Sequence, residues 1–396
     1  MLFLSFCLWC SALAFPSQNP PNIDGVMVYP IVYEDRENDQ QKVIVLGNQH
    51  SIELKRASVL APKVLLRNYK DDGITDQYVS GAHYERHLYE NAPYKASLLV
   101  KPRKGGRYHI AGFINSTHSI EPMKDRMDLE SGIPHRISRI PSSTRSACRE
   151  MIKARSRTNT SVTFPEARKR TARHVIEIFL MSDSTHTEGL RRRNLDPMEY
   201  FMTFMYKVSL ELQQLKPPVW ITVTGHQATD TKNVAYESRT PSGDLYDSAT
   251  LKMLKLYATK QRFFQDCDLV ILFTQSALVK EGAPPTLGIA YREGVCTEYR
   301  EAVVKDPGIR NIGVYSATHE IGHSLGSYHD GAGTSVDCPA KDGYIMNPMD
   351  AGLHPDEFSR CSKAAIASYL RHPDTSCLRY RAARKSSRLL PRPVRL

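Results

Sequence analysis

The chain has 396 residues, a formal net charge of +11 and eight cysteines. Its length allows two domains with separate cores, and its ordinary apolar and charged fractions exclude a collagen, a coiled coil and a wholly disordered chain. The basic excess gathers in residues 136–173 and after residue 377 without interleaved aromatic side chains, so we interpret it as a solvated linker and tail and expect no nucleic-acid partner.

The first residues predict export. Residues 2–14 are almost entirely apolar and end in Ala-Leu-Ala, the pattern that a signal peptidase reads, and the stretch is too short to span a bilayer. The usual positive charge at the start is missing, and the alternative is a buried N-terminal strand or helix. No later segment is apolar for long enough to span a membrane. We expect residues 1–14 to be a signal peptide and the protein to be secreted.

Residues 15 to about 130 are rich in short apolar alternations. Examples lie at residues 25–32, 42–46 and 63–67, and turn residues at 71–73 and 104–106 separate such runs. Alternation with a period of two, bounded by Asp, Asn and Gly, is typical of strands. This region predicts a small β-rich domain.

Residues 136–173 are polar and rich in arginine, and they show no convincing periodicity. We interpret them as an exposed linker. The linker ends in a basic cluster in which Arg170 and Arg173 fit a minimal Arg-x-x-Arg pattern, which a furin-like or trypsin-like processing protease would cut. The alternative is a merely basic loop.

Cysteines and sequons fit the secretory route. Cys7 and Cys10 would leave with the signal peptide, and the six others have no CxxC spacing, so they predict disulfides in an oxidising compartment. Asn115 and Asn159 each begin an Asn-x-Ser/Thr glycosylation sequon.

The pattern changes after the basic cluster. Strand patterns at residues 174–181, 219–224 and 268–274 alternate with helix patterns at residues 197–215 and 246–264, and two more helices follow at 313–325 and 358–370. Helices that alternate with strands predict an α/β fold with a mostly parallel, twisted sheet flanked by helices.

The main functional signal is a cluster of histidines. His319 and His323 are four residues apart, which on a helix places both imidazoles on one face where they can share a metal. Gly326 ends the helix, and the chain turns back so that His329 supplies a third nitrogen. Three protein ligands leave one zinc position open for water, which is the catalytic arrangement.

Glu320 supplies the remaining group for peptide hydrolysis. It adjoins the first ligand and is expected to act as the general base toward a zinc-activated water. A catalytically inactive relative would have lost Glu320 or a ligand histidine, and none is lost. A zinc-storage site would need a fourth ligand, for which only Cys338 is near.

The run His319 to His329, with Glu320 and Gly326, resembles the metzincin signature. Residues 343–347 resemble the methionine turn, with Met346 below the zinc. Asp330, directly after the third histidine, resembles the reprolysin (adamalysin) branch, where its role is structural. The resemblance covers roughly residues 174–377 and is strongest to the antarease-like scorpion venom metalloproteases or related arachnid salivary enzymes.

This resemblance implies a domain organisation and a function. Residues 174–378 would form a metzincin catalytic domain with the zinc site in its cleft, residues 15–173 a propeptide with the arginine-rich linker, and residues 379–396 a basic tail. The protein would be a secreted zinc endopeptidase that is made as a zymogen, is activated by a processing protease and acts on proteins or peptides. A venom or salivary role follows from the resemblance alone.

The resemblance also implies two disulfides, Cys296–Cys377 and Cys338–Cys361, which leave Cys267 and Cys148. A propeptide thiolate can fill the open zinc position and silence a precursor, so Cys148 is a candidate switch. Its flanking residues do not resemble the usual switch motif closely. The alternatives are a disulfide between Cys148 and Cys267, or a free thiol.

A calcium site is common in the reprolysin branch. Glu177 and Asp266 match two of its carboxylates, whereas Tyr380 replaces the terminal Asn of the family, which makes calcium doubtful. The alternative is that both carboxylates are surface charges.

Overall fold

The computed structural model describes residues 25–34, 40–47, 50–123, 132–140, 147–151, 173–232, 234–308, 313–349 and 352–379, and of residues 147–151 it describes the backbone alone. The predicted signal peptide, Asn159, Arg170, Tyr380 and the basic tail after it lie outside these residues.

The N-terminal part of the chain forms a sheet in which every pair of neighbours is antiparallel. Its strands, in spatial order, are β1 (Met27–Val28), β11 (His135–Arg139), β10 (His118–Pro122), β9 (Arg107–Phe113), β8 (Ala96–Arg103), β7 (Leu88–Asn91), β4 (His50–Arg56), β3 (Gln41–Leu46) and β2 (Ile31–Glu34). Alternate residues of β3 are buried, as in a strand with one face on a core. That core contains Ile44, Leu54, Val100 and Ile110.

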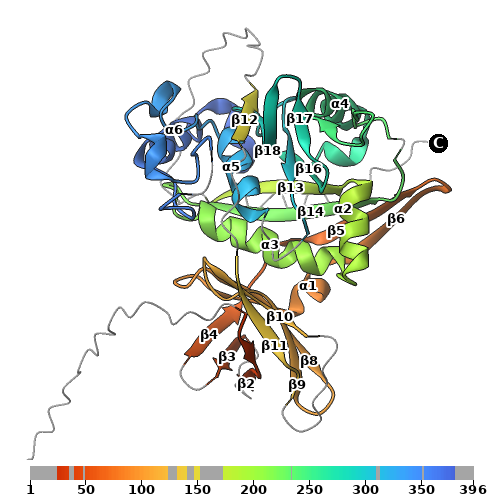
Figure 1. Cartoon of the computed structure of the whole chain (residues 1–396), viewed down its shortest axis with the longest axis vertical. Helices are drawn as coiled ribbons and strands as arrows, with labels where there is room; N and C mark the ends of the chain where they lie inside the picture. The colour runs from red at the N-terminus through yellow and green to blue at the C-terminus, as the bar shows by residue number, and fades with distance from the viewer. Residues whose placement is uncertain are drawn as a thin grey trace, which may run out of the picture.

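The second sheet lies above the first in Figure 1 and carries the predicted α/β domain. In spatial order its strands are β15 (Leu245–Tyr246), β17 (Leu278–Lys280), β18 (Ala283–Tyr291), β19 (Glu301–Lys305), β16 (Leu269–Thr274), β13 (His174–Ser182), β14 (Val219–Thr229), β5 (Leu60–Lys70) and β6 (Gly73–Ser80), and β12 (Ala147–Met151) also pairs with β18. The central neighbours from β19 to β5 are parallel, whereas β18 is antiparallel to β17 and β19, and β6 is antiparallel to β5. The prediction of an α/β fold is confirmed, but antiparallel strands flank the parallel centre.

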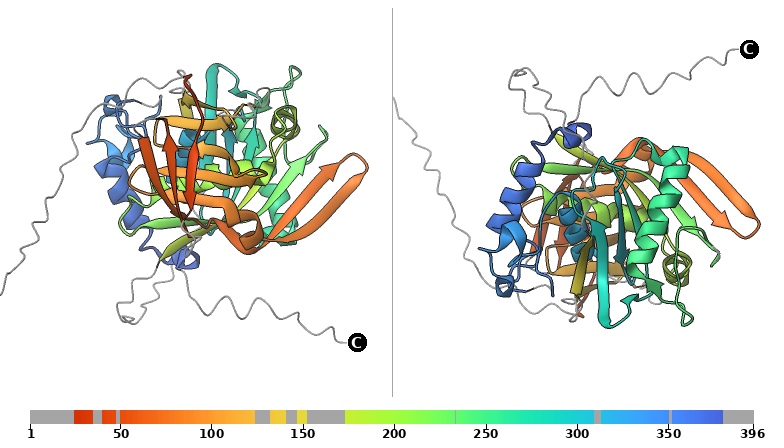
Figure 2. Two further views of the ribbon diagram at one scale, coloured as in Figure 1. Left: turned by 90° about the horizontal axis from the view of Figure 1, so that it is seen from below. Right: turned by 90° about the horizontal axis from the view of Figure 1, so that it is seen from above.

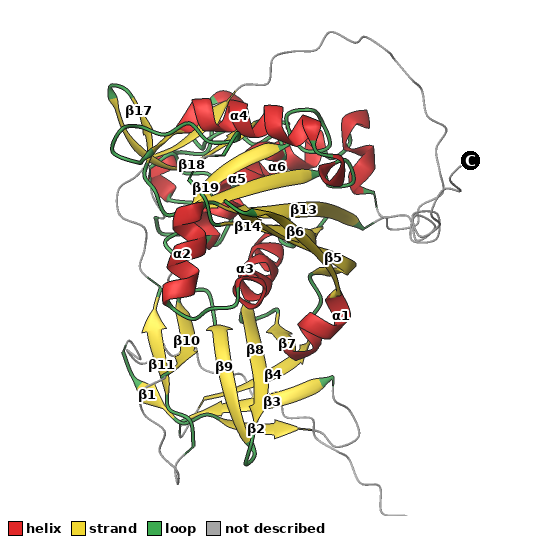
Figure 3. Cartoon of the chain, turned by 90° about the vertical axis from the view of Figure 1, so that its right-hand side faces the viewer, coloured by secondary structure: helices red, strands yellow, loops and turns green. Residues whose placement is uncertain are grey.

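Helices cover both faces of the second sheet (Figure 3). They are α1 (Gly81–Tyr84), α2 (Ser184–Arg192), α3 (Pro197–Leu212), α4 (Asp247–Lys260), α5 (Val314–Ser324) and α6 (Arg360–Tyr369). One apolar core joins one face of the sheet to α3, α5 and α6, and a second core joins the other face to α4. The predicted start of α3 is explained by Asp196, whose side chain accepts from Glu199 N, with Pro197 in the first turn. Among the described residues no helix is long and apolar enough to cross a membrane.

One segment of the predicted β-rich domain leaves it. Residues 60–80 form the hairpin β5–β6, which extends the second sheet instead of the first (Figure 2). The predicted turn at residues 71–73 is where this hairpin reverses. A period of two predicts a strand but not the sheet that the strand joins, because either sheet accepts the same alternation.

The linker predicted from residue 136 is also shorter than expected. β11 pairs with β1 and β10, and its residues Ile137 and Ser138 are each 2% exposed, while Arg136 and Arg139 face solvent. β12 pairs in parallel with β18. The prediction of a linker was therefore wrong for β11 and β12. In β11, a five-residue strand with two exposed arginines, too few positions are apolar for the strand pattern to stand out.

Candidate metal centre

Helix α5 carries His319 and His323, and both side chains are fully buried. The helix ends as predicted at Gly326, which has φ of +95°. Gly326 N donates to His323 O and Ser327 N donates to Gly322 O, which completes a Schellman cap. A cap that only glycine enters without strain reverses the chain and brings His329 back to the helix.

The three Nε2 atoms of His319, His323 and His329 converge on one point. The separations are 3.1 Å between His319 and His323, 3.0 Å between His323 and His329, and 3.2 Å between His329 and His319. A tetrahedral zinc ion with bonds of about 2.1 Å holds its ligand nitrogens about 3.4 Å apart. The three nitrogens therefore fit one zinc ion.

The opposite ring nitrogens explain this orientation. His319 Nδ1 lies 2.6 Å from the carbonyl oxygen of Ile345, and His323 Nδ1 lies 2.8 Å from that of Ser327. Because a carbonyl only accepts, each Nδ1 donates a proton and each Nε2 keeps its lone pair. Two Nε2 lone pairs cannot bond each other, so the short separations between them are those of metal ligands.

Burial keeps the histidines neutral and ready to bind a cation. Desolvation lowers the pKa of His319 to about 3 and that of His329 to about 4, and it lowers the pKa of His323 well below its usual value. The neighbouring imidazoles add to the shift at His319 and His323. A neutral imidazole is the form that binds a metal.

Glu320 is fully buried, and its carboxylate lies against the backbone of β18. A Cβ built on Gly288 would lie 2.4 Å from Glu320 Oε1 and 2.6 Å from its Cγ. Real Cβ contacts are essentially never so short, so a side chain at position 288 would force the Glu320 carboxylate to move. Sequence reasoning missed the contact, because nothing local marks which strand faces Glu320.

Met346 lies below the zinc helix, as the resemblance implied. It is fully buried, and a Cβ on Gly322 of α5 would lie 2.5 Å from its sulfur. Its carbonyl accepts from Asp330 N at 2.9 Å, and the carbonyl of Ile345 is the partner of His319. The turn thus supports two parts of the site.

Asp330 ties the loop of the third histidine to α6. Its Oδ1 accepts from the hydroxyls of Ser359 at 2.6 Å and Ser362 at 3.1 Å, and the side chain is buried. Ser359 is also the N-cap of α6. This contact positions His329 through the residue that follows it.

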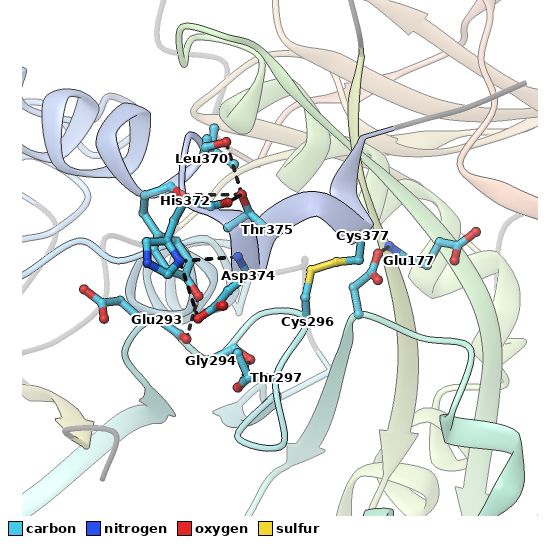
Figure 4. Close-up of a disulfide and its surroundings, with 12 residues drawn as sticks. Glu177, Glu293, Gly294, Cys296, Thr297, Leu370, His372, Asp374, Thr375 and Cys377 are labelled. Carbon is cyan, nitrogen blue, oxygen red and sulfur yellow. Dashed lines mark hydrogen bonds and ion pairs between the residues drawn. A yellow bond between two sulfur atoms is a disulfide. The ribbon is translucent and has the colours of Figure 1, made fainter. Parts of the chain in front are cut away.

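Two disulfides brace the chain around the centre. Cys296 pairs with Cys377, with Cα atoms 6.1 Å apart, and Cys338 pairs with Cys361 at 6.0 Å. These are the pairs that the resemblance implied. Figure 4 shows the first of them, which joins the loop after β18 to the last described turn.

The two remaining cysteines differ. Cys267 is a free, buried thiol that donates to Phe264 O at 3.1 Å, and burial raises its pKa to about 12. The alternative disulfide between Cys148 and Cys267 is therefore not formed. Cys148 lies in β12, whose side chains are outside the described atoms, and the neighbours Ala147 and Arg149 pair with Thr286 and Ile289 of β18.

The carboxylates of the predicted calcium site are not equivalent. Glu177 on β13 is half-buried near the Cys296–Cys377 disulfide (Figure 4), and Asp266 is exposed. Asp268, rather than Asp266, accepts from Glu177 N at 2.9 Å. Since Tyr380 lies outside the described residues, the calcium site stays a prediction.

The predicted glycosylation site at Asn115 and the predicted processing-site residue Arg173 both lie within the described part of the chain. Asn115 is half-buried, and its Oδ1 accepts from Thr117 N and His118 N at 2.8 Å each. Arg173 is exposed at the start of the second domain, where its guanidinium lies 5.3 Å from the Trp220 ring centroid.

Comparison with known proteins finds similarity to zinc metalloproteases, which agrees with a zinc site at the three histidines. Residues 245–381 match the family described as reprolysin (M12B) family zinc metalloprotease. The chain is similar to the venom metalloproteinase antarease TserMP_A of Tityus serrulatus, with 26% identity over 330 residues that cover 74% of this chain and 79% of that protein. It is also similar to the antarease-like TtrivMP_A of Tityus trivittatus, with 24% identity over 89% of this chain and 92% of that protein. A shorter match is to the snake venom metalloproteinase fibrolase of Macrovipera lebetinus, with 36% identity over 24% of this chain and 46% of that protein.

Proposed function

We propose that this chain, whose residues 245–381 match the reprolysin (M12B) zinc metalloprotease family, is a secreted zinc endopeptidase that is made as a zymogen. The observation that carries the proposal is the convergence of three neutral imidazole nitrogens beside a buried carboxylate on the same helix. Three ligands on one side of a zinc ion leave room for water, as catalysis requires.

The chemistry divides between the metal and the chain. A zinc ion at His319, His323 and His329 supplies Lewis-acid chemistry that makes water nucleophilic near neutral pH. Glu320 takes the proton of the attacking water as general base and returns it to the leaving amine as general acid. The Glu320 carboxylate lies against the backbone of β18 at Gly288, which limits where that carboxylate can lie.

Latency is assigned to the N-terminal half of the chain. β12 pairs with β18, the strand that faces Glu320, so residues 147–151 occupy a strand edge beside the site. An extended substrate peptide would need such an edge for its own backbone hydrogen bonds. Cys148 within β12 is the candidate zinc ligand of the precursor, and Arg170 and Arg173 follow as the candidate processing site.

Export is supported by the leader-like residues 1–14, the sequons at Asn115 and Asn159 and the relatives, which are named venom proteins. The same relatives support a venom or salivary effector that acts on protein or peptide substrates. Three histidine ligands with an open fourth position are typical of a catalytic rather than a structural zinc site.

The test is Glu320→Gln, which keeps the size of the side chain and removes the base. Cleavage of a peptide library by the processed protein should fall about 10²- to 10⁴-fold, while bound zinc, measured by mass spectrometry, stays at one per chain. Glu281→Gln, an exposed acid before β18, is the matched control and should behave as the parent. Full activity of Glu320→Gln would refute the mechanism, and absence of cleavage by the zinc-loaded parent would refute the function.

A further inference from the structure

The hairpin β5–β6 comes from the N-terminal half but belongs to the sheet of the catalytic domain. β5 runs parallel to β14, with Leu65 to Tyr69 opposite Gly225 to Thr229. Val223 N donates to Val59 O at 2.7 Å, just before the hairpin. A Cβ on Gly225 would lie 2.8 Å from Leu65 O, so the two backbones meet closely. The hairpin is therefore held by a backbone ladder as well as by side chains.

Side chains of the N-terminal half are also part of the catalytic cores. Seven of them share the core of α3 and α5, namely Ala57, Val59, Leu60, Val64, Leu88, Leu99 and Phe113. Leu65 enters the core on the other face with Phe179 and is 4% exposed. The guanidinium of Arg67 lies 4.0 Å from the ring centroid of Phe263. Burial of this kind is typical of permanent rather than transient interfaces.

A cluster of charged side chains, Lys95, Glu211 and Asp356, lies between the N-terminal half and the catalytic domain, next to the methionine turn. Lys95 Nζ lies 3.0 Å from Glu211 Oε2 of α3 and 2.8 Å from Asp356 Oδ2. Ser116 Oγ donates to the same oxygen of Asp356 at 2.6 Å. Glu211 is 3% exposed and also pairs with Lys207, so the loss of Lys95 would leave a buried carboxylate short of partners.

Hydrogen bonds join the two connections between the hairpin and the N-terminal sheet. Glu85, just after α1, accepts from Ser58 Oγ at 2.7 Å and from the amides of Val59 and Leu60 at 3.0 and 2.9 Å. A separate bond joins the N-terminal sheet to the catalytic domain, where Ser97 Oγ of β8 donates to Thr203 O of α3 at 2.9 Å. The N-terminal sheet and the hairpin are therefore joined to each other, and both contact the catalytic domain.

We propose that the N-terminal half stays bound to the catalytic domain as a separate chain after the linker is cut, with β5 still a strand of the catalytic sheet. Its departure would bare the edge of β14 and the apolar face of α3, both of which are unfavourable in water. β12 lies on the N-terminal side of Arg173, so it stays on β18. The proposal rests on the proposed zymogen function and adds that linker cleavage alone does not free the site.

The test uses the full chain with Glu320→Gln, which prevents self-digestion. The linker is cut with a furin-like protease, complete cleavage is verified on a denaturing gel, and the product is passed over a gel-filtration column at about 100 nM, a concentration at which weak complexes separate. We expect both fragments to elute together at the position of the uncut chain. Elution as two separate species would overturn the proposal.

Two cross-strand partners provide matched variants. Leu65 is opposite Tyr78 in the hairpin, and Leu65 is buried whereas Tyr78 is 57% exposed. Leu65→Glu should raise the dissociation constant of the cut fragments at least about 100-fold, since it buries a charge, while Tyr78→Glu should change it less than about threefold. Equal effects of the two variants would overturn the role of the hairpin.

Lys95→Ala covers the case in which Leu65→Glu does not fold, because Lys95 is partly exposed and its loss leaves the apolar contacts intact. It should raise the dissociation constant about tenfold, and no effect would overturn the role of the charged cluster. Hydrogen exchange of the β14 amides should stay slow in the cut complex. None of these measurements needs peptide cleavage, so a failure of the proposed catalytic function would be seen separately, in the zinc-loaded parent.

Discussion

Gly288 and Glu320 are in close contact across the site: a Cβ on Gly288 would lie 2.4 Å from the Oε1 atom of Glu320. Glu320, the proposed general base, belongs to helix α5, but Gly288 on strand β18 limits where its carboxylate can lie. This pair has a direct consequence for activity.

Gly288→Ala should displace the Glu320 carboxylate and lower kcat/KM about 10- to 100-fold, because small misplacements of a catalytic group are costly. Bound zinc should be unchanged, since the three atoms nearest to the added Cβ all belong to Glu320, which is not a ligand. The readouts are peptide cleavage and metal content. Pro285→Ala, at an exposed position on the same strand, is the control. Normal kcat/KM in Gly288→Ala would mean that the carboxylate has room to spare.

Gly322→Ala should lower stability by about 1–3 kcal/mol, because the new methyl group would overlap the sulfur of Met346, 2.5 Å away. Chemical denaturation of the full chain measures the change. Met346→Ala removes the obstacle, so the double variant should cost less than the sum of the two single variants. Strict additivity of the two substitutions would contradict a direct contact.

Asp330→Ala should weaken zinc binding about 10- to 100-fold, because the loop of His329 loses its two hydroxyl donors on α6. Competition with a chelator gives the affinity. Asp330→Asn retains one acceptor oxygen and should lie between the parent and Asp330→Ala. The reverse order of the two variants would show that charge, not anchoring, is what matters at this position.

His135 predicts an acid sensitivity of the N-terminal domain. It is 1% exposed, accepts from Ile110 N at 2.9 Å and donates toward Ile133 O at 2.8 Å, and burial lowers its pKa to about 4. Because the folded-state pKa lies below the unfolded value of about 6.5, its contribution is full above pH 6.5 and is lost as the pH falls toward 4.

From pH 7 to pH 5 the loss from His135 should be about 2 kcal/mol of unfolding free energy. His135→Gln should remove this part of the pH dependence, as measured by denaturant titration at the two pH values. His83→Gln, which changes an exposed histidine, should leave the dependence as it is. An unchanged slope in His135→Gln would show that this ring does not titrate in the folded state as we expect.

Much of the α/β part of the chain could be predicted from local patterns. The helix at 313–325, its glycine end at Gly326 and the strands near 174–181 and 268–274 appear where the periodicity put them. Helix α2 was missed because its sequence is polar and its buried residues include His186 and Thr187, which show no apolar stripe. Its stability comes from the Asp183 cap and from contacts that no local pattern reveals.

The sequence by itself determined which atoms are available to hold zinc, because helical periodicity and a glycine cap are local properties that place His319, His323 and His329 together. Tertiary structure alone decided that Gly288 lies against Glu320, and that β5 joins the catalytic sheet instead of its own. Those contacts join residues far apart in the chain, and a strand with a given alternation packs equally well in either sheet until the rest of the fold is formed.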